Sequence, residues 1–378
     1  MTSIKHLSVK DVHHLSDKNK DSIEIVQLSR NGSLSESEND EEEPNTQSAL
    51  VITSFDEPLK LSKIPIPKLN DHDILVQNKA IGLNPIDWKA KKYRFGVYSF
   101  PWINGRESSG VVVKLGSKVS NFEINDSVIV SSTSYRDNRT STFQEYTAID
   151  SRLVWKLPKF LSYEDGATLG VGLVTAGTIL NKSFDLSLVA SEANKGKTLI
   201  IWGGSTVVGI YVTQLAKIIG LNVISISTID HKEYLLTLGA DKVIDRNLET
   251  KELIEHIPDK IHFAVDCISK ETSLKLIDIL VNKSVFSDHK PLFSGIVGIP
   301  KDVPSSIEVK EVIIKQFHED IEYGSKFVQV TSELLHAKKL IPIRFKHFND
   351  GGLDSITSGL TDLELTGAKA EKYVVSLK

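Results

Sequence analysis

Apolar residues fall into two patterns along this chain. From residue 48 to residue 149 they form short runs separated by turn residues, the pattern of strands in an antiparallel, barrel-like domain. From residue 198 to residue 298, short apolar runs alternate with amphipathic stretches, which predicts a doubly wound parallel sheet. The apolar segment 162–180 predicts one helix that bridges the two parts, with Ser162 as its N-cap. Residues 338–378 read as strand, helix and strand, and we expect them to rejoin the barrel.

A glycine-rich turn stands between a strand and a helix in residues 198–228, TLIIWGGSTVVGIYVTQLAKIIGLNVISIST. This order is typical of a unit that binds dinucleotide phosphates, because the turn lets backbone N–H groups at the helix start face a pyrophosphate. The strict fingerprint is incomplete, since Thr206 stands at its second glycine position. The residues predicted to contact the cofactor here are Gly203, Gly204, Ser205, Thr206, Val207, Val208 and Gly209.

The end of the second strand of this unit bears on cofactor preference. A site for NAD would place Asp or Glu there to bind the ribose 2′-hydroxyl. This chain has Ser227 and Thr228 instead, followed by His231 and Lys232, which can meet a 2′-phosphate. Asp230 is discordant, because its charge would repel that phosphate if it pointed inward. The sequence therefore predicts NADPH as the cofactor.

Composition and charge exclude several classes of protein. The formal net charge of the 378 residues is only -4, and no basic stretch alternates with aromatic residues, so no nucleic-acid partner is expected. The longest apolar segment is interrupted by the glycine turn and Lys217, so no membrane span is expected. No apolar segment follows Met1, which favours a cytoplasmic protein. Cys267 is the only cysteine, which rules out an intramolecular disulfide and a thiolate zinc cluster.

Several further motifs occur in a characteristic order. They are AIGLNPIDWK at 80–89, the spaced set Gly105, Glu107, Gly110 and Gly116, the segment FEINDSVIV at 122–130, LGAD at 238–241 and VDC at 265–267. In this order they resemble the medium-chain dehydrogenase/reductase family over residues 48–378. Within that resemblance, Asn125 replaces a usual glycine.

The resemblance implies an α/β fold with a GroES-like β-barrel catalytic domain and a doubly wound, parallel-sheet Rossmann domain. We expect a disordered acidic tail over residues 1–46, because this segment lacks apolar periodicity and ends in SLSESENDEEEPN. We assign residues 47–180, completed by 339–378, to the catalytic domain and residues 181–338 to the NADPH-binding domain.

The same resemblance argues against zinc. Alcohol dehydrogenases of the family bind catalytic zinc through a cysteine and a histidine at the positions that are Asn84 and Arg106 here. No metal ligand is therefore expected. The zinc-free branch of quinone oxidoreductases and enoyl reductases is the better match, with fungal trans-enoyl reductase-like and NADPH-dependent aldehyde reductase-like proteins sharing its motifs.

Without zinc, hydride transfer suits an electrophile that spreads its charge, such as an enone, an enal, a quinone or, next, an aldehyde. The predicted catalytic residues are Lys89, Asn84 and Thr175, and Pro85, Asp87, Lys89 and Cys267 are further predicted cofactor contacts. An Asn-Pro pair is also an ordinary turn, so Asn84 and Asp87 are interpreted as shaping residues. The sequence does not choose a phenol donor among Tyr93, Tyr98, Tyr135 and Tyr146.

Two other functions stay open at this point. One is a non-catalytic scaffold or cofactor-sensing protein, which the departures at Thr206, Arg246 and Asn125 keep in view. The other is a trans-acting enoyl reductase that works on a carrier-bound chain. A small-molecule carbonyl or enone is the expected substrate of the leading hypothesis. A monomer and a homodimer are both consistent with the run PLFSGIVG at 291–298, either as a sheet edge or as a buried strand.

Overall fold

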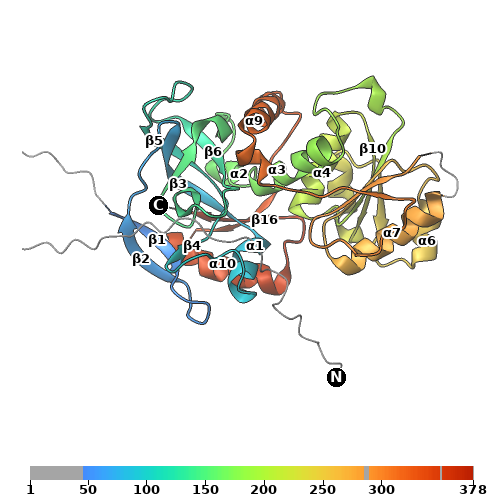
Figure 1. The fold of residues 1–378 in the computed structure, drawn as a ribbon, viewed down its shortest axis with the longest axis horizontal. Helices are drawn as coiled ribbons and strands as arrows, with labels where there is room; N and C mark the ends of the chain where they lie inside the picture. Colours follow the sequence, from blue (N-terminus) through green and yellow to red (C-terminus); the bar gives the residue numbers. More distant parts are fainter. Residues whose placement is uncertain (1–45, 285–288, 350, 378) are drawn as a thin grey trace, which may run out of the picture. The chain divides into compact units, whose positions relative to one another are not determined.

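The computed structural model describes residues 46–284, 289–349 and 351–377 (Figure 1). The predicted disordered tail, residues 1–46, lies outside the described residues except for Thr46, which begins the first strand. None of the helices in these described ranges is long and apolar enough to cross a membrane.

The barrel-like part consists of two sheets, ordered β2-β1-β4 and β15-β16-β3-β5-β6-β8, with β7 also paired to β3. Neighbouring strands in these sheets are antiparallel, except that β15 and β16 are parallel. Their bounds are β1 (Thr46–Ile52), β2 (Lys60–Pro65), β3 (Asp73–Leu83), β4 (Trp102–Ile103), β5 (Glu107–Leu115), β6 (Ser127–Ser131), β7 (Tyr146–Asp150), β8 (Trp155–Lys156), β15 (Phe345–Phe348) and β16 (Lys372–Ser376). Tyr373 of β16 lies opposite Leu83 of β3. The C-terminal segment thus pairs with a strand of the barrel.

The second part is a parallel sheet of six strands, in the order β11-β10-β9-β12-β13-β14. The strands are β9 (Thr198–Trp202), β10 (Asn222–Ser227), β11 (Lys242–Asp245), β12 (Phe263–Asp266), β13 (Leu292–Gly295) and β14 (Glu308–Val309). This order is that of a doubly wound dinucleotide-binding fold, as the sequence predicts. The run 291–298 could form a sheet edge or a buried strand, and β13, which lies between β12 and β14, is an inner strand.

Helices cover both faces of this sheet because its strands are apolar on both sides. Leu199 and Ile201 of β9 belong to the apolar cluster under α4 (Val207–Ile218), α5 (Lys232–Thr237) and α9 (Ile321–His336). Ile200 and Trp202 belong to the cluster under α6 (Thr250–His256) and α7 (Lys270–Ser284). Successive side chains of this buried strand point to opposite faces of the sheet, so they contribute alternately to the two cores.

Between the two parts, the structure differs from the single bridging helix that the sequence predicts. Ser162 does cap a helix, accepting a hydrogen bond from Asp165 N, but this helix, α2 (Tyr163–Gly166), ends after one turn. A second helix, α3 (Val171–Thr178), follows and continues into a π-helical turn, Ile179–Ser183. The short helix α8 (Gln316–Glu319) packs against α3, and α9 contacts β8.

Two local departures from the family pattern have simple structural causes. Asn125, which replaces a glycine, has a φ of 75°, and asparagine tolerates this left-handed conformation better than most residues. The Asn84-Pro85 pair is not an ordinary turn. It begins helix α1 (Pro85–Lys92), with Asn84 as N-cap and proline at the first helical position, where its missing N–H has no consequence.

Candidate active site

The glycine turn after β9 is tightly packed. Gly203 has a φ of 84°, and a Cβ added at Gly204 would lie 1.7 Å from Ser225 Oγ. A Cβ added at Gly209 would lie 2.3 Å from the carbonyl oxygen of Gly203, so this position also requires glycine. Thr206, which departs from the fingerprint, is the N-cap of α4, and its hydroxyl accepts a hydrogen bond from Gly209 N at 3.0 Å. The turn therefore presents a helix N-terminus suited to an anion.

Orphaned polar atoms gather beside this turn. In the part of the chain that the structure describes, three buried atoms near the carboxyl ends of β10 and β12 have no hydrogen-bond partner: Ser225 Oγ, Ser227 Oγ and Asp266 Oδ2. Burial raises the pKa of Asp266. Cys267 is next to it, and burial raises the pKa of its thiol to about 12, so the thiol stays neutral. A dinucleotide would supply partners for these atoms, and the residues present fit such a cofactor.

Basic side chains surround the end of β10. Thr228 and His231 are half-buried and Lys232 is exposed. Burial, followed by the charge of Arg344, lowers the pKa of His231. The Arg344 guanidinium lies 3.3 Å from His231 Nδ1, and the backbone N–H of Arg246 donates to the carbonyl of Ser227 at 2.9 Å. Sequence reasoning missed Arg344, because 113 residues separate it from His231.

At the barrel end of the site, Lys372 is buried with an exposure of only 1%. Its ammonium donates to Asn84 Oδ1 at 2.7 Å and to Glu107 Oε1. Asn84 Nδ2 also donates to Glu107 Oε1, at 2.6 Å. Backbone closely surrounds the carboxylate, since a Cβ added at Gly170 would lie 2.4 Å from Glu107 Oε2. Sequence reasoning found Asn84 and the Glu107 motif but missed Lys372.

Glu107 also connects the barrel to the glycine turn through α3. Its second oxygen, Oε2, accepts a hydrogen bond at 2.9 Å from the backbone N–H of Val171, the first residue of α3. The next residue, Gly172, packs so closely on the first residue of α4 that an added Cβ would lie 2.4 Å from Val207 Cγ1. The buried network and the phosphate-binding turn are therefore two ends of one series of contacts.

The other two predicted catalytic residues, Thr175 and Lys89, lie outside the Lys372 network. Thr175 donates to the Val171 carbonyl at 2.7 Å, a bond within its own helix. Lys89 is half-buried, and its ammonium lies 5.5 Å from the centre of the Trp88 ring. No hydrogen bond or ion pair of the Lys89 side chain is found among the described residues. Pro85 is exposed at the start of α1, and neither Pro85 nor Lys89 takes part in the Lys372 network.

Asp87 is a buried carboxyl on the first turn of α1. Its Oδ2 accepts a hydrogen bond from Asn84 N at 2.8 Å, while its Oδ1 has no partner in the described residues. Burial raises the pKa of Asp87 to about 6, against hydrogen bonding to Asn84 and the positive charge of Arg106. Asn84 and Asp87 are thus hydrogen-bonded to each other at the start of α1.

Arg106 lies on the other side of Asp87, with only 3% of its surface exposed. Its guanidinium carbon lies 4.7 Å from the centre of the Tyr135 ring. Burial lowers the pKa of Arg106, and burial raises that of Tyr135. Tyr135 is thus the tyrosine of the four candidates that contacts a buried cation of the site.

The residues present do not fit a catalytic zinc. Both polar atoms of the Asn84 amide are hydrogen-bonded, and the Arg106 guanidinium has no lone pair to offer a metal. A buried ammonium, that of Lys372, already lies beside the Glu107 carboxylate. Among the described residues, no group of three or more His, Cys, Asp or Glu side chains is placed to bind a metal ion.

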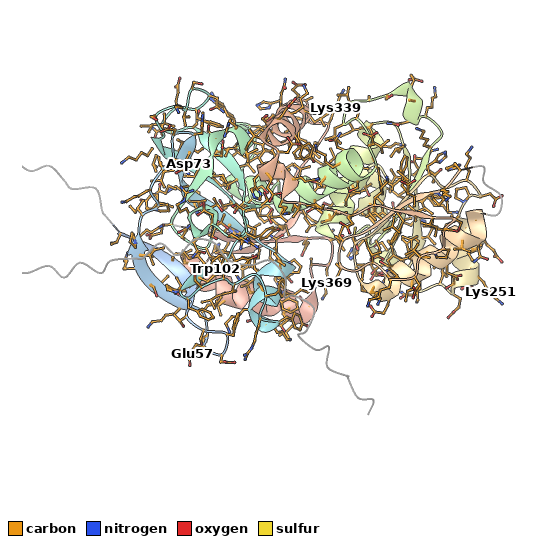
Figure 2. The ribbon with its side chains drawn as sticks, in the orientation of Figure 1. Glu57, Asp73, Trp102, Lys251, Lys339 and Lys369 are labelled. Atoms are coloured by element: carbon orange, nitrogen blue, oxygen red, sulfur yellow. The ribbon has the colours of Figure 1, made fainter. Side chains whose placement is uncertain are left out.

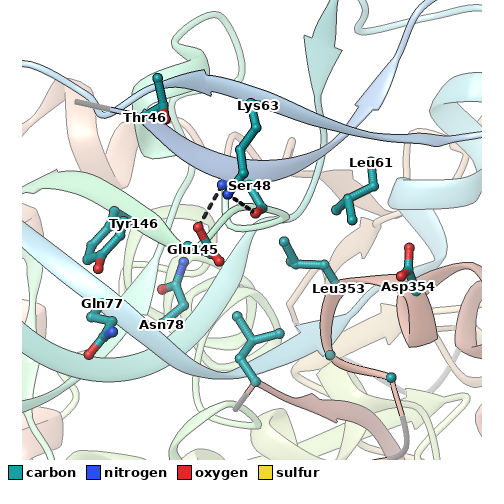
Figure 3. Close-up of a pocket in the computed structure, with 13 residues that line it drawn as sticks. Thr46, Ser48, Leu61, Lys63, Gln77, Asn78, Glu145, Tyr146, Leu353 and Asp354 are labelled. Carbon is teal, nitrogen blue, oxygen red and sulfur yellow. Dashed lines mark hydrogen bonds between the residues drawn. The ribbon is translucent and has the colours of Figure 1, made fainter. Parts of the chain in front are cut away.

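A separate cavity of about 420 Å³ opens elsewhere on the barrel, between β1, β3 and the segment before α10 (Ser355–Thr366) (Figure 3). Within it, Glu145 Oε2 accepts a hydrogen bond from Ser48 N at 2.6 Å, and Lys63 donates to the Ser48 hydroxyl at 2.9 Å. Tyr146 also lines it, but none of the predicted catalytic or cofactor-binding residues does.

Known proteins resemble this chain along most of its length. Residues 70–159 match the alcohol dehydrogenase GroES-like domain, and residues 207–286 match the family model described as zinc-binding dehydrogenase. The uncharacterized protein YNL134C of Saccharomyces cerevisiae is 31% identical in an alignment that spans 388 positions, gaps included, and covers 89% of this chain and 99% of that protein. The trans-enoyl reductase ACTTS2 of Alternaria alternata is 28% identical over 353 residues, covering 88% of this chain and 99% of that enzyme.

The fold is shared more widely. The crystal structure of an alcohol dehydrogenase superfamily protein from Novosphingobium aromaticivorans matches with a TM-score of 0.75 at 20% identity, covering 88% of this chain and 100% of that one. The barrel, the doubly wound sheet, the glycine turn and these matches lead to one assignment. The chain belongs to the medium-chain dehydrogenase/reductase family, and it is an oxidoreductase with a nicotinamide cofactor.

Proposed function

We propose that this chain is a zinc-independent, NADPH-dependent reductase that transfers a hydride to an activated alkene such as an enone, an enal or a quinone, or to an aldehyde. The reduced nicotinamide supplies the hydride when it is bound. The observation that carries the proposal is the buried Lys372–Glu107–Asn84 network. In it, the fixed ammonium of Lys372 is hydrogen-bonded to the oxygen atoms that a metal ion would need as ligands. With no Lewis acid, substrates that spread negative charge by conjugation are favoured.

The choice of NADPH rests on the charges around Ser227. His231, Lys232, Arg246 and Arg344 come from three separate segments and gather near the end of β10, where a 2′-phosphate would need cationic partners. Asp230 is exposed, which reduces the weight of its opposing charge.

Reduction of an alkene is the first choice because a relative of nearly the same length, ACTTS2, is named a trans-enoyl reductase. That name also supports a carrier-bound chain as a second candidate substrate. Free enones and the same acyl groups attached to a carrier protein should be compared directly, and the better substrate by kcat/KM decides between the two.

Cofactor binding tests the proposal first. Trp202 is buried and directly precedes Gly203, so its fluorescence should report occupancy of the turn. We expect NADPH to bind at least about tenfold more tightly than NADH, because charge-assisted hydrogen bonds to the phosphate are strong. Arg344→Gln should weaken NADPH binding several-fold and leave NADH binding unchanged, whereas Lys251→Gln, at an exposed position on α6, should change neither. Preference for NADH would contradict the proposal.

Metal dependence is tested on the same protein. After dialysis against a chelator, the reductase should retain its turnover of enones, and added zinc should not raise it. Activity that disappears on dialysis and returns with zinc would overturn zinc independence. If neither nicotinamide cofactor binds, the non-catalytic scaffold takes the place of the reductase.

A further inference from the structure

Arg106 is a buried cation whose hydrogen-bonding capacity is unused. Its side chain is 3% exposed, and its Nη1 is buried without a partner in the described residues. No hydrogen bond of the guanidinium and no ion pair within 4.0 Å is found in the part of the chain that the structure describes. A guanidinium carries five N–H donors, and leaving one buried and unpaired costs about 1–3 kcal/mol. Such an arrangement persists where a ligand supplies the missing acceptor.

The surroundings of Arg106 are aromatic on one side and polar on the other. Tyr135 lies under the guanidinium at 4.7 Å. Trp102, labelled in Figure 2, is buried, and its ring centre lies 5.4 Å from that of Tyr98. The indole Nε1 of Trp102 is a second buried donor without a partner in the described residues.

Two hydroxyls on the segments beside Arg106, one at the end of β6 and one in the loop before β7, are unpaired as well within the described ranges. Thr142 Oγ1 has no partner, and the backbone N–H of Thr142 donates to the carbonyl of Gly105, next to Arg106. Ser131 Oγ also lacks a hydrogen-bond partner there. The backbone N–H of the next residue, Ser132, donates to the Arg106 carbonyl at 2.7 Å. Unpaired polar atoms therefore concentrate around this residue rather than being scattered.

Lys372 does not compete for the same role. Its ammonium already donates to Asn84 and Glu107, and it is enclosed by them. Arg106 directly precedes Glu107, whose carboxylate reaches the N-terminus of α3. The free cation is thus one residue away from the network that connects the barrel to the phosphate-binding turn.

We infer that Arg106 binds the carbonyl oxygen of the substrate, and that the substrate is an α,β-unsaturated carbonyl compound whose apolar body lies against Tyr135, Tyr98 and Trp102. This inference rests on the proposed reductase function and gives it a substrate-binding residue. A hydride leaves the reduced nicotinamide and forms a C–H bond at the β-carbon. The alkene π pair shifts to give an enolate, whose oxygen accepts hydrogen bonds from Arg106, and a proton from water then adds at the α-carbon.

Kinetics of Arg106→Met test the role of this residue in the reaction. Loss of a hydrogen-bond donor to a developing oxyanion typically lowers kcat by about 100- to 1,000-fold, and we expect a loss of this size. The Kd of NADPH should stay within about twofold, because Arg106 makes no contact with the glycine turn. Arg106→Lys keeps the charge without the planar fork and should lie between wild type and Arg106→Met.

Arg136→Met is the matched control. Arg136 lies on the same loop as Tyr135 and over an aromatic ring, that of Tyr98 at 5.2 Å, but it is more exposed than Arg106. This variant should keep wild-type kcat/KM. An equal effect of Arg106→Met and Arg136→Met on kcat/KM would overturn the inference.

A binding measurement keeps the inference testable without turnover. In the NADPH-bound protein, 3-phenylpropanoate carries a charged oxygen pair that resembles the enolate, and 3-phenylpropanamide is its neutral control. The carboxylate should bind to wild type at least about tenfold more tightly than the amide does. In Arg106→Met, and only in this variant, the two ligands should bind equally tightly. Equal binding to wild type would overturn the role of Arg106. Arg106-dependent binding without reduction of any enone would instead overturn the proposed function alone.

Discussion

Buried ionisable side chains lie close together at the barrel end of the site. Some of them are paired with an opposite charge and others are not. Lys372 and Glu107 are paired with each other and with Asn84. Asp87 and Arg106 influence each other electrostatically but form no ion pair, and each has a buried polar atom without a partner among the described residues. Breaking a buried pair is expensive, whereas unpaired groups are available to a ligand. The two sets therefore differ in role, one holding the structure and the other open to substrate.

The pKa of Asp87 makes a prediction about stability. Because burial raises it from 3.8 to about 6, the folded protein binds a proton that the unfolded chain has already released between these pH values. The stabilising contribution of Asp87 is present below about pH 4 and is lost as the pH rises through about 6. Asp87→Asn keeps an acceptor for Asn84 N but cannot ionise.

Relative to wild type, Asp87→Asn should therefore gain about 3 kcal/mol of unfolding free energy between pH 4 and pH 7, because the pKa of Asp87 is about two pH units higher in the folded protein than in the unfolded chain. Urea unfolding at several pH values measures this difference. A difference between the two proteins that does not change with pH would contradict the burial argument.

At the scale of the elements, α3 is in close contact with three other parts of the molecule. Its N-terminus binds the Glu107 carboxylate, Gly172 packs on α4, and Gly177 packs on α9. The apolar run that contains these glycines predicts a helix, but only its neighbours explain why glycine occupies these positions.

Substitution of Gly177 tests this packing. A Cβ added there would lie 2.0 Å from Phe327 Cε2, and Phe327 is buried between α3 and β8. Gly177→Ala should lower the free energy of unfolding by about 1–3 kcal/mol through overpacking, despite the better helix propensity of alanine. Adding Phe327→Leu should recover part of the loss in chemical denaturation. A more stable Gly177→Ala protein would show that α3 and α9 are not in tight contact.

For the molecule as a whole, the C-terminal strand completes the barrel. β16, labelled in Figure 1, lies between β15 and β3. Its first residue is the buried Lys372. Val374 and Val375 of this strand belong to the barrel core.

A chain that ends at Glu371 should therefore lose cooperative unfolding of the barrel, since β3 loses one of its paired strands and the Glu107 carboxylate loses the Lys372 ammonium. Thermal melts followed by circular dichroism measure the transition, with a chain lacking only Lys378 as the control. A truncated protein that melts like this control would contradict the central place of β16.

Local patterns in the sequence determined the strands, the glycine turn and the alternation of strands and helices that forms a doubly wound sheet. They could do so because apolar alternation and the conformational freedom of glycine act over a few residues, as in β9 and at Gly203. The same patterns predict one bridging helix, because the break at Gly170 depends on its close approach to the distant Glu107. Helix α9 was not predicted, although its sequence is amphipathic.

Only the tertiary structure decided which charges meet. Lys372 lies 288 residues from Asn84 and 265 from Glu107, and Arg344 lies 113 from His231, so no local pattern could pair them. A lysine or arginine in sequence is usually a solvated surface group, and its chemistry changes when the fold buries it. Residue types and spacing determined the family and the cofactor-binding turn, whereas burial and long-range pairing decided that Lys372 is enclosed and that Arg106 is left without a partner among the described residues.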